Sequence, residues 1–265
     1  MSKEKKGAAP LLDLDAQYRK IGGEVRKAVR KVLESGQFIL GPEVQSFEEE
    51  AASYLRCETA IGVASGSDAL LLSLMALGIG PDDAVLVSPF TFFSTVSSIT
   101  RLGATPLFVD IDPGNFLMDS RKVEVLLRER CRSSPDGTGL LDARSGCQVK
   151  ALMPVHLFGQ CSPMSPLLSL AKKYRLRIIE DVAQAFGARA SLPREVTKAA
   201  GTLGDLGCFS FFPTKILGGA GDGGLVTTNQ KELARKVRML RVHGQSAKYR
   251  HEAIGINSRL DSIQA

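Results

Sequence analysis

The chain has 265 residues, of which 44% are hydrophobic and 23% are charged, a balance close to that of an average globular protein. This composition excludes an intrinsically disordered chain, a collagen and a small disulfide scaffold, and no apolar run reaches the roughly 20 residues that a membrane-spanning helix needs. The formal net charge is +6, so an anionic partner is a candidate, either a nucleic acid or a small molecule that carries phosphate. Basic stripes on helices are, however, usually solvated faces.

Cysteine and histidine usage indicates neither a metal site nor a disulfide framework. The five cysteines include no C-x-x-C pair, and the three histidines lack the spacing of zinc ligands. The first ten residues are charged without an apolar stretch behind them, so we expect no secretory signal. These features predict a reducing, cytoplasmic environment.

Helices and strands are expected to alternate along most of the chain. Apolar residues recur at helical spacing from Asp15 to Ser35, and a second short helix is expected after Pro42. Strands are predicted at 60–64, 84–88, 105–110, 149–155 and 176–181, and helices at 68–77, 92–102, 121–130 and 164–174. This alternation predicts an α/β fold with a mostly parallel central sheet and helices on both faces, which binds ligands beyond the carboxyl ends of its strands.

Two segments depart from this alternation. Residues 131–148 are polar and are expected to form a surface excursion without a function of its own. Residues 257–265, with the sequence NSRLDSIQA, are typical of the opening of an amphipathic helix that has no C-cap. We therefore expect the chain to be cut at this point.

A short polar sequence follows the first predicted strand. Ser65, Gly66 and Ser67 precede a helix, and a helix N-terminus presents free backbone N–H groups and the positive end of its dipole to an anion. This pattern is compatible with a phosphate site. Ser-Gly-Ser before a helix is also ordinary N-capping, and for this pattern taken alone N-capping is the preferred explanation.

Two other predicted strand ends carry chemistry. The strand 176–181 ends in Glu180 and Asp181, whose carboxylates either cap a helix or face a cation. The segment 208–224 contains a formal G-x-G-x-x-G match, but a strand follows it rather than a helix, which disfavours a dinucleotide site. Lys215 lies between an aromatic strand and this glycine-rich loop, where desolvation would favour a neutral, nucleophilic amine. An ordinary surface lysine is the alternative.

Several motifs occur together in a fixed order. They are SGSDAL, FTFFST, EDVAQAFGA, FSFFPTK and NSRLD. The chain thereby resembles the DegT/StrS family of pyridoxal-phosphate (PLP)-dependent nucleotide-sugar aminotransferases from about Leu12 to its last residue. The resemblance implies the large domain of the fold type I transferases, with the C-terminal small domain absent. It also implies an N-terminal helical segment over 1–35, a PLP-binding domain over 36–250, and the start of a connection to the small domain over 251–265.

The resemblance assigns four residues to the cofactor ring. Lys215 matches the lysine that binds the cofactor aldehyde covalently, and Asp181 matches the carboxylate that faces the pyridine nitrogen and keeps it protonated. Gln184 matches a residue beside the ring, and Phe92 matches the aromatic side chain that stacks on it. Lys215 also argues against the related dehydratases, which carry histidine at this position.

The resemblance assigns four further residues to the cofactor phosphate. Gly66, Ser67 and Ser210 match phosphate ligands, in agreement with the argument from the helix terminus. Ser67 stands where the family commonly has threonine, and either hydroxyl donates to phosphate. Asn257 matches a phosphate contact from the neighbouring subunit, so a homodimer with shared active sites is implied.

The implied activity is transfer of an amino group, with glutamate as the expected donor, to a nucleotide-linked keto-sugar in amino-sugar and polysaccharide biosynthesis. Lys215 would move the proton at the donor's α-carbon. The first alternative is a PLP-binding regulatory protein of the same fold without turnover. The second is a basic nucleic-acid-binding module, which ranks well behind; neither a nucleic-acid nor a membrane partner is expected.

Overall fold

The computed structural model describes residues 12–135, 137, 139–193 and 196–265, so residues 1–11 of the predicted N-terminal segment lie outside the described part. The helices are α1 (Leu14–Ser35), α2 (Pro42–Leu55), α3 (Gly66–Ala76), α4 (Phe93–Thr100), α5 (Ser120–Arg130), α6 (Met164–Tyr174) and α7 (Lys231–Leu240). The strands of the main sheet are β1 (Thr59–Val63), β2 (Asp83–Val87), β3 (Thr105–Phe108), β4 (Cys131–Ser133), β5 (Leu140–Asp142), β6 (Gln148–Met153), β7 (Arg177–Asp181), β10 (Leu206–Ser210) and β11 (Gly224–Thr228). Two small hairpins are β8 (Arg189–Ser191) with β9 (Thr197–Ala199), and β12 (Gln245–Ala247) with β13 (Arg250–His251).

The main sheet is mixed but mostly parallel. Its strand order is β1-β11-β10-β7-β6-β2-β3. The pairs β10–β7, β7–β6, β6–β2 and β2–β3 are parallel, whereas β11 runs antiparallel to both of its neighbours, β1 and β10. Consequently β1 points in the same direction as β10, and β1, β2, β6, β7 and β10 all end at the same edge of the sheet. The α/β fold predicted from the sequence is confirmed.

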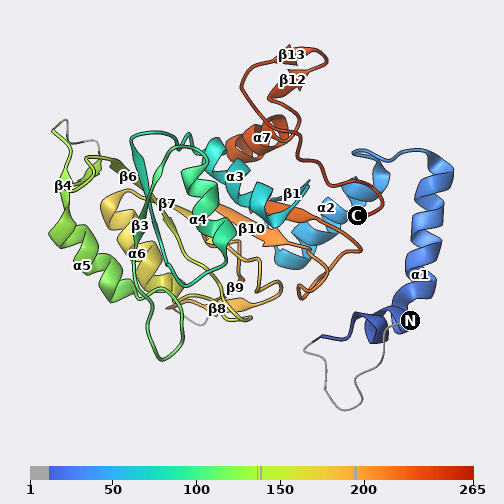
Figure 1. Ribbon diagram of the computed structural model, residues 1–265, viewed down its shortest axis with the longest axis horizontal. Coiled ribbons are helices and arrows are strands. Elements are labelled where there is room, and N and C mark those ends of the chain that lie inside the picture. Colours follow the sequence, from blue (N-terminus) through green and yellow to red (C-terminus); the bar gives the residue numbers. More distant parts are fainter. Residues whose placement is uncertain (1–11, 136, 138, 194–195) are drawn as a thin grey trace, which may run out of the picture.

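Helices cover both faces of this sheet (Figure 1) because the strand side chains alternate between two cores. Ile179 packs with residues of α3, α4 and α7 in the first core, whereas its neighbour Ile178 packs with residues of α5 and α6 in the second. A third cluster joins α2 to Phe209 and Leu225 on the same side as the second. Strand β2 is buried along its whole length, as its run of apolar residues predicts.

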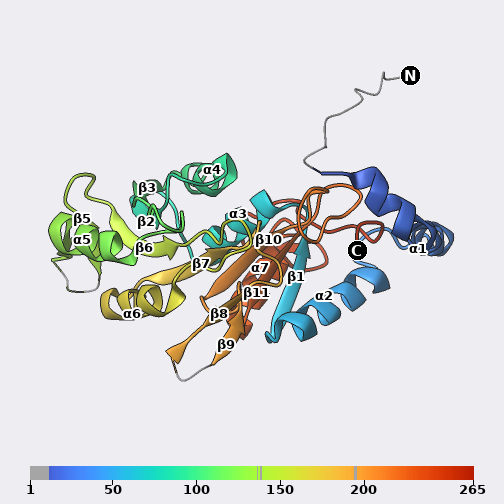
Figure 2. The ribbon, with the colours of Figure 1, turned by 90° about the horizontal axis from the view of Figure 1, so that it is seen from below.

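Helix α1 lies away from the sheet, at one end of the molecule (Figure 2). Its ends follow the sequence signals: the side chain of Asp13 accepts a hydrogen bond from the backbone N–H of Ala16, and Gly36 adopts the left-handed conformation with φ of 68°. Gly22 and Val32 are its buried residues. Within the described part of the chain, no helix combines the length and the apolar character that a membrane crossing requires.

The segment 131–148 contains two strands that the sequence did not predict. Strands β4 and β5 form an antiparallel pair, and β5 continues into the main sheet by pairing with the start of β6. At the end of β5, the buried carboxylate of Asp142 accepts hydrogen bonds from Arg130 and from the hydroxyl of Ser145. The excursion is therefore anchored to the sheet rather than irregular.

The helix predicted to open in residues 257–265 is present only as a single turn after Asp261, whose carbonyl accepts from the N–H groups of Gln264 and Ala265. Asn257 makes an isolated bridge with Val242, and Asp261 makes one with Ile39. The backbone N–H of Ser262 donates to the carbonyl of Phe38 at 2.8 Å. Pairing with these two distant segments keeps residues 257–261 out of a helix, so the helical pattern of the sequence takes effect only after Asp261.

Candidate active site

A cavity of about 390 Å³ opens at the edge where the parallel strands end. It is lined by seven of the eight predicted site residues: Gly66, Ser67, Phe92, Asp181, Gln184, Ser210 and Lys215. These residues are far apart in the sequence, and the common direction of β1, β7 and β10 brings them together. Its volume lies within the range of small-molecule sites.

The N-terminus of α3 forms one end of the cavity. The hydroxyl of Ser65 caps the helix by accepting from the N–H of Asp68 at 3.1 Å, which leaves the N–H groups of Gly66 and Ser67 without a partner inside the helix. A Cβ atom on Gly66 would lie 2.6 Å from the Cβ of Ser210. Glycine is thus what allows the end of β10 to approach the helix terminus so closely. The three residues together form a cradle suited to an anion.

Asp181 ends β7 and is 4% exposed. The hydroxyl of Thr95 donates to its Oδ2 at 2.8 Å, and the N–H of Ala183 donates to its Oδ1 at 3.1 Å. Burial raises the pKa of Asp181 above its ordinary value, while these two hydrogen bonds and the nearby His156 and Lys215 lower it. A buried carboxylate at a cavity wall is a partner for a cationic group of a ligand.

Lys215 belongs to the loop that joins β10 to β11. The loop is closed at its base by the hydrogen bond from Phe211 N–H to the carbonyl of Gly223, and its turn includes the bond from Lys215 N–H to the carbonyl of Phe212, both 2.8 Å. Lys215 is half-buried. Its amine and the carboxylate of Asp181 therefore belong to two walls of one cavity.

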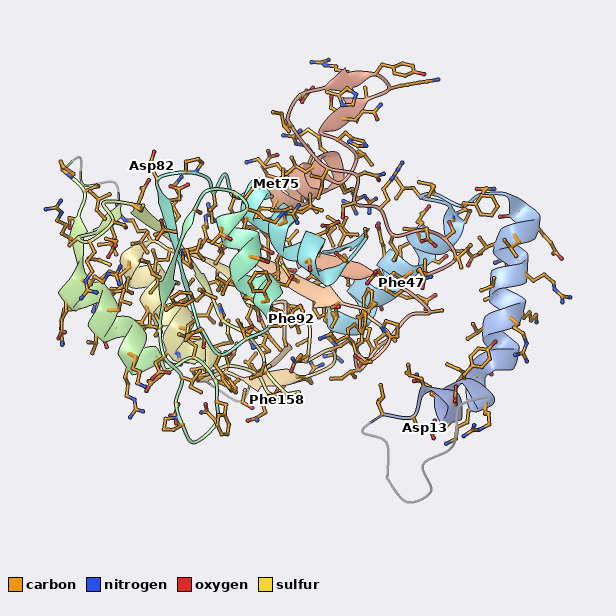
Figure 3. The ribbon with its side chains drawn as sticks, viewed as in Figure 1. Asp13, Phe47, Met75, Asp82, Phe92 and Phe158 are labelled. Carbon is orange, nitrogen blue, oxygen red and sulfur yellow. The ribbon has the colours of Figure 1, made fainter. Side chains whose placement is uncertain are left out.

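One exposed aromatic residue lines the cavity, and another is hydrogen-bonded to a residue that lines it. Phe92 precedes α4 in an extended conformation and is 70% exposed although it lines the cavity. Phe158 is also exposed, and its N–H donates to the side-chain oxygen of Gln184 at 3.3 Å. Figure 3 labels both rings. An exposed ring at a cavity wall offers a stacking surface for a flat ligand.

Asn257 is the predicted site residue that does not line this cavity. It is exposed, and its side-chain oxygen accepts from Nε of Arg259 at 2.8 Å. Its assignment to a neighbouring subunit stays a prediction.

Sequence reasoning missed the hydroxyl groups around Asp181. Thr91, Ser94 and Thr95 line the cavity, and they belong to the FTFFST motif in which Phe92 was singled out. Their spacing, with Thr91 and Thr95 four residues apart at a helix start, was the available signal. The contact between Thr95 and Asp181, 86 positions apart, had no signal in the sequence.

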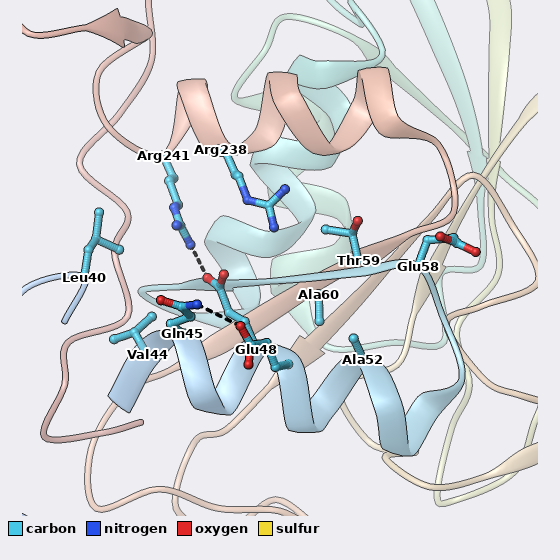
Figure 4. Close-up of a pocket in the computed structure, with 11 residues that line it drawn as sticks. Leu40, Val44, Gln45, Glu48, Ala52, Glu58, Thr59, Ala60, Arg238 and Arg241 are labelled. Carbon is cyan, nitrogen blue, oxygen red and sulfur yellow. Dashed lines mark hydrogen bonds and ion pairs between the residues drawn. The ribbon is translucent and has the colours of Figure 1, made fainter. Parts of the chain in front are cut away.

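A second cavity of about 400 Å³ lies between α2, β1 and α7 (Figure 4). Its walls include Glu48 and Arg241, which form an ion pair at one end. The predicted site residues do not line it. The chemistry expected from the sequence therefore belongs to the cavity that contains Lys215.

Comparison with protein families decides the relationship of the chain. Residues 19–265 match the model of the DegT/DnrJ/EryC1/StrS aminotransferase family. The chain belongs to this family. The resemblance inferred from its motifs is confirmed.

Relatives and solved structures agree with this assignment. The chain is 43% identical over 256 residues to the pleiotropic regulatory protein of Geobacillus stearothermophilus, and 42% identical over 258 residues to the UDP-N-acetyl-3-dehydro-α-D-glucosamine 3-aminotransferase of Acidithiobacillus ferrooxidans. These matches cover 97% of the chain but 63% and 64% of the relatives. The crystal structure of S. venezuelae DesV in complex with a ketimine intermediate superimposes with a TM-score of 0.85 at 41% identity, over 96% of this chain and 62% of that one. The chain thus spans less than two thirds of the length of these proteins.

The cofactor of this family is pyridoxal 5′-phosphate, and the structure of Bacillus subtilis NtdA, 28% identical with a TM-score of 0.82, holds the related cofactor PMP. That match covers 100% of this chain and 55% of NtdA. The residues described above fit such a cofactor. The cradle at Gly66 suits its phosphate, the buried Asp181 suits its pyridine nitrogen, and Lys215 supplies an amine for its aldehyde.

Proposed function

We propose that the chain is the cofactor-binding part of an aminotransferase that moves an amino group from glutamate to a nucleotide-linked keto-sugar. The observation that carries this proposal is that Lys215 and Asp181 line one cavity beside the anion cradle of α3. Relatives about 40% identical are named as transaminases of UDP-linked and dTDP-linked sugars. We place the activity in amino-sugar and polysaccharide biosynthesis.

The chain's residues would divide the chemistry among them. Bound PLP supplies an electron sink for the carbanion formed at the α-carbon of the donor. Gly66, Ser67 and Ser210 hold the phosphate, and Asp181 holds a proton at the ring nitrogen. The amine of Lys215 takes the proton from the α-carbon and returns it during transfer to the ketone. Phe92 and Gln184 orient the ring from its sides.

Lys215→Ala and Lys215→Arg test this proposal. We expect the purified protein to acquire a visible absorbance band with PLP, and glutamate to bleach it as the amino group is transferred. Both variants should lose the band and the bleaching while keeping the unfolding midpoint of the unaltered protein. Survival of the band in Lys215→Ala would contradict the assignment of the amine.

One relative supports a second candidate function. The protein of Geobacillus stearothermophilus, 43% identical to this chain, is named a pleiotropic regulatory protein. A PLP-binding regulator without turnover would show the absorbance band with PLP but no bleaching by glutamate. The glutamate addition therefore separates the two candidates in one titration.

Assembly, location and domain division complete the proposal. We infer a homodimer in which Asn257 of each subunit contacts the phosphate in the other, supported by the exposure of Asn257 outside its own cavity. Sedimentation velocity of the unaltered protein and of Asn257→Ala, with PLP affinity measured in both, tests this.

The cysteines are all unpaired in the described residues, which supports a cytoplasmic location. Residues 36–250 are proposed as the PLP-binding domain, between a helical segment at 1–35 and a connecting segment at 251–265.

A further inference from the structure

A chain of hydroxyl groups leads from the cavity to the buried carboxylate of Asp181. Thr91 lines the cavity, and its hydroxyl lies 2.8 Å from the hydroxyl of Thr95. Thr95 is 1% exposed, and its hydroxyl donates to Oδ2 of Asp181, also at 2.8 Å. Thr91 and Thr95 are four residues apart at the start of α4, which places them on one side of the helix terminus.

The direction of these hydrogen bonds follows from a proton count. A threonine hydroxyl has a single proton to donate. Thr95 uses its proton for the ionised Asp181, so it must accept the proton of Thr91 in the contact between the two hydroxyls. If Asp181 were neutral and donated through Oδ2, both bonds would have to reverse. With an ionised Asp181, the proton count thus fixes both directions, Thr91 donating to Thr95 and Thr95 donating to the carboxylate.

We propose that Thr95 is a positioning residue for Asp181 and that Thr91 fixes the direction of the Thr95 hydroxyl, so that the carboxylate is held as an ionised acceptor facing the cavity. The proposal rests on the proposed function in one respect, namely that the group donating a hydrogen bond to Asp181 from the cavity is the pyridine nitrogen of the cofactor. The hydroxyl chain itself belongs to the protein without any ligand.

The ionisable pair next to Asp181 does not replace Thr95 as a hydrogen-bond donor to the carboxylate. The backbone N–H of Ser162 donates to Nδ1 of His156 at 2.9 Å, and Nε2 of His156 pairs with the carboxylate of Glu180 at 2.8 Å. Both ring nitrogens of His156 are therefore already engaged. Glu180 also accepts three backbone N–H groups, from residues 201, 203 and 204. The side chains of this pair contribute no hydrogen bond to the carboxylate of Asp181.

The other neighbouring groups are Lys215 and Cys208. Lys215 lines the same cavity and lowers the pKa of Asp181 through its charge, but it is assigned to the cofactor aldehyde. Cys208 is buried beside Asp181 in the adjacent strand, and burial raises the pKa of its thiol, so the thiol stays neutral. Among the described residues, Thr95 is the side chain that hydrogen-bonds Asp181. Burial raises the pKa of Asp181, and the Thr95 bond is the strongest opposing influence.

The first experiment measures the titration of Asp181 in the protein without cofactor, by carboxyl carbon NMR. Thr95→Val removes the donor with little change in volume and should raise the pKa of Asp181 by about one to two pH units. Thr95→Ser restores the hydroxyl and should restore the titration. Thr91→Val should produce a smaller rise in the same direction. Thr100→Val, which removes an exposed hydroxyl of the same helix that donates to the carbonyl of Ser97, is the matched control and should change nothing.

The second experiment measures the affinity for PLP and for an analogue with carbon in place of the ring nitrogen. Thr95→Val should weaken PLP binding by about tenfold to a hundredfold, because the ring nitrogen of PLP pairs with the carboxylate that Thr95 positions. The analogue has no ring nitrogen, so its affinity should not change. An unchanged Asp181 titration in Thr95→Val, or equal weakening of both ligands, would overturn the proposal. If Thr95→Val does not fold, Thr91→Val takes its place in the test. An unchanged titration of Asp181 in Thr91→Val would also overturn the proposal. Failure of the unaltered protein to bind PLP would contradict the proposed function, while the titration would still test the hydroxyl chain.

Discussion

Glu48 of α2 and Arg241, which follows α7, form a nearly buried ion pair over the outer edge of β1. Their side chains are 12% and 9% exposed. The carboxylate of Glu48 also accepts from the N–H of Gly62 at 2.8 Å, and the guanidinium of Arg241 donates to the carbonyl of Gly62 at 2.8 Å. The two side chains thus satisfy both backbone groups of an edge residue that has no further strand beside it.

Breaking this pair should be costly because the partner charge remains buried. We expect Glu48→Leu to lower the free energy of unfolding by about 3–5 kcal/mol, measured by urea denaturation. The double variant Glu48→Leu with Arg241→Met should lose less than Glu48→Leu alone, since Nε of Arg241 already lacks a hydrogen-bond partner in the described structure. Glu49→Leu, at an exposed neighbouring position, serves as the control. A double variant less stable than either single one would contradict this interpretation.

Acid should destabilise the protein partly through Asp142. Burial alone would raise the pKa of this carboxyl, but hydrogen bonds from Arg130 and Ser145 hold it well below its ordinary value. A lowered pKa in the folded state stabilises the protein above the unfolded-state pKa of about 3.9, and this stability is lost as the pH falls below that value.

The test is Asp142→Asn. We expect it to cost about 2–4 kcal/mol at pH 7 and to flatten the fall in stability between about pH 5 and pH 2. Asp82→Asn, at an exposed turn position, should leave the pH profile as it is. Parallel profiles for Asp142→Asn and the unaltered protein would show that the acid sensitivity arises elsewhere.

Two glycines in helices should respond oppositely to alanine. In Gly66→Ala the new Cβ would lie 2.6 Å from the Cβ of Ser210, so we expect a loss of about 1–3 kcal/mol and weaker PLP binding. Gly23→Ala in α1 meets nothing within 4 Å and should stabilise by up to about 1 kcal/mol. Thermal unfolding with and without PLP measures both. Equal effects at the two positions would rule out the close approach at α3 as the cause.

The cysteines should differ in reactivity. Burial raises the pKa of Cys131 and of Cys161 to about 11, and the nearby carboxylates of Asp142 and Glu180 add to this. At pH 8 these thiols should react with a thiol reagent about a hundredfold more slowly than a free cysteine, and the buried Cys208 more slowly still. Mass spectrometry of the labelled protein gives the order. In urea the five rates should converge, and persistent differences there would point to a cause other than the fold.

The central sheet and its helices could be predicted from the sequence, because the strands at 59–63, 83–87 and 177–181 are buried apolar runs whose composition reflects their environment. Strands β4 and β5 could not. They are three residues long and lie in a polar segment, and their conformation depends on pairing with β6. Residues 257–261 are not helical for the same reason, since pairing with Val242 and Ile39 determines their conformation, and only the turn after Asp261 follows the predicted pattern.

Site residues that lie in recognisable motifs could be predicted from the sequence, whereas contacts between distant segments could not. Gly66, Asp181 and Lys215 are recognisable from their motifs, and all three line one cavity. The hydrogen bond from Thr95 to Asp181 joins a helix start to a strand end that the sequence separates widely. Only the arrangement of α4 against β7 reveals that Thr95 in FTFFST donates to Asp181 in EDVAQAFGA.

The reversed strand β11 governs how the Lys215 amine is placed. Because β10 and β11 are antiparallel, Ser210 and Gly224 pair with each other, and this pairing fixes both ends of the loop that joins the two strands. Lys215 consequently belongs to a loop of fixed length whose two ends are attached to interior strands of the sheet rather than to an edge strand. The position of the amine should therefore be lost when the sheet itself unfolds.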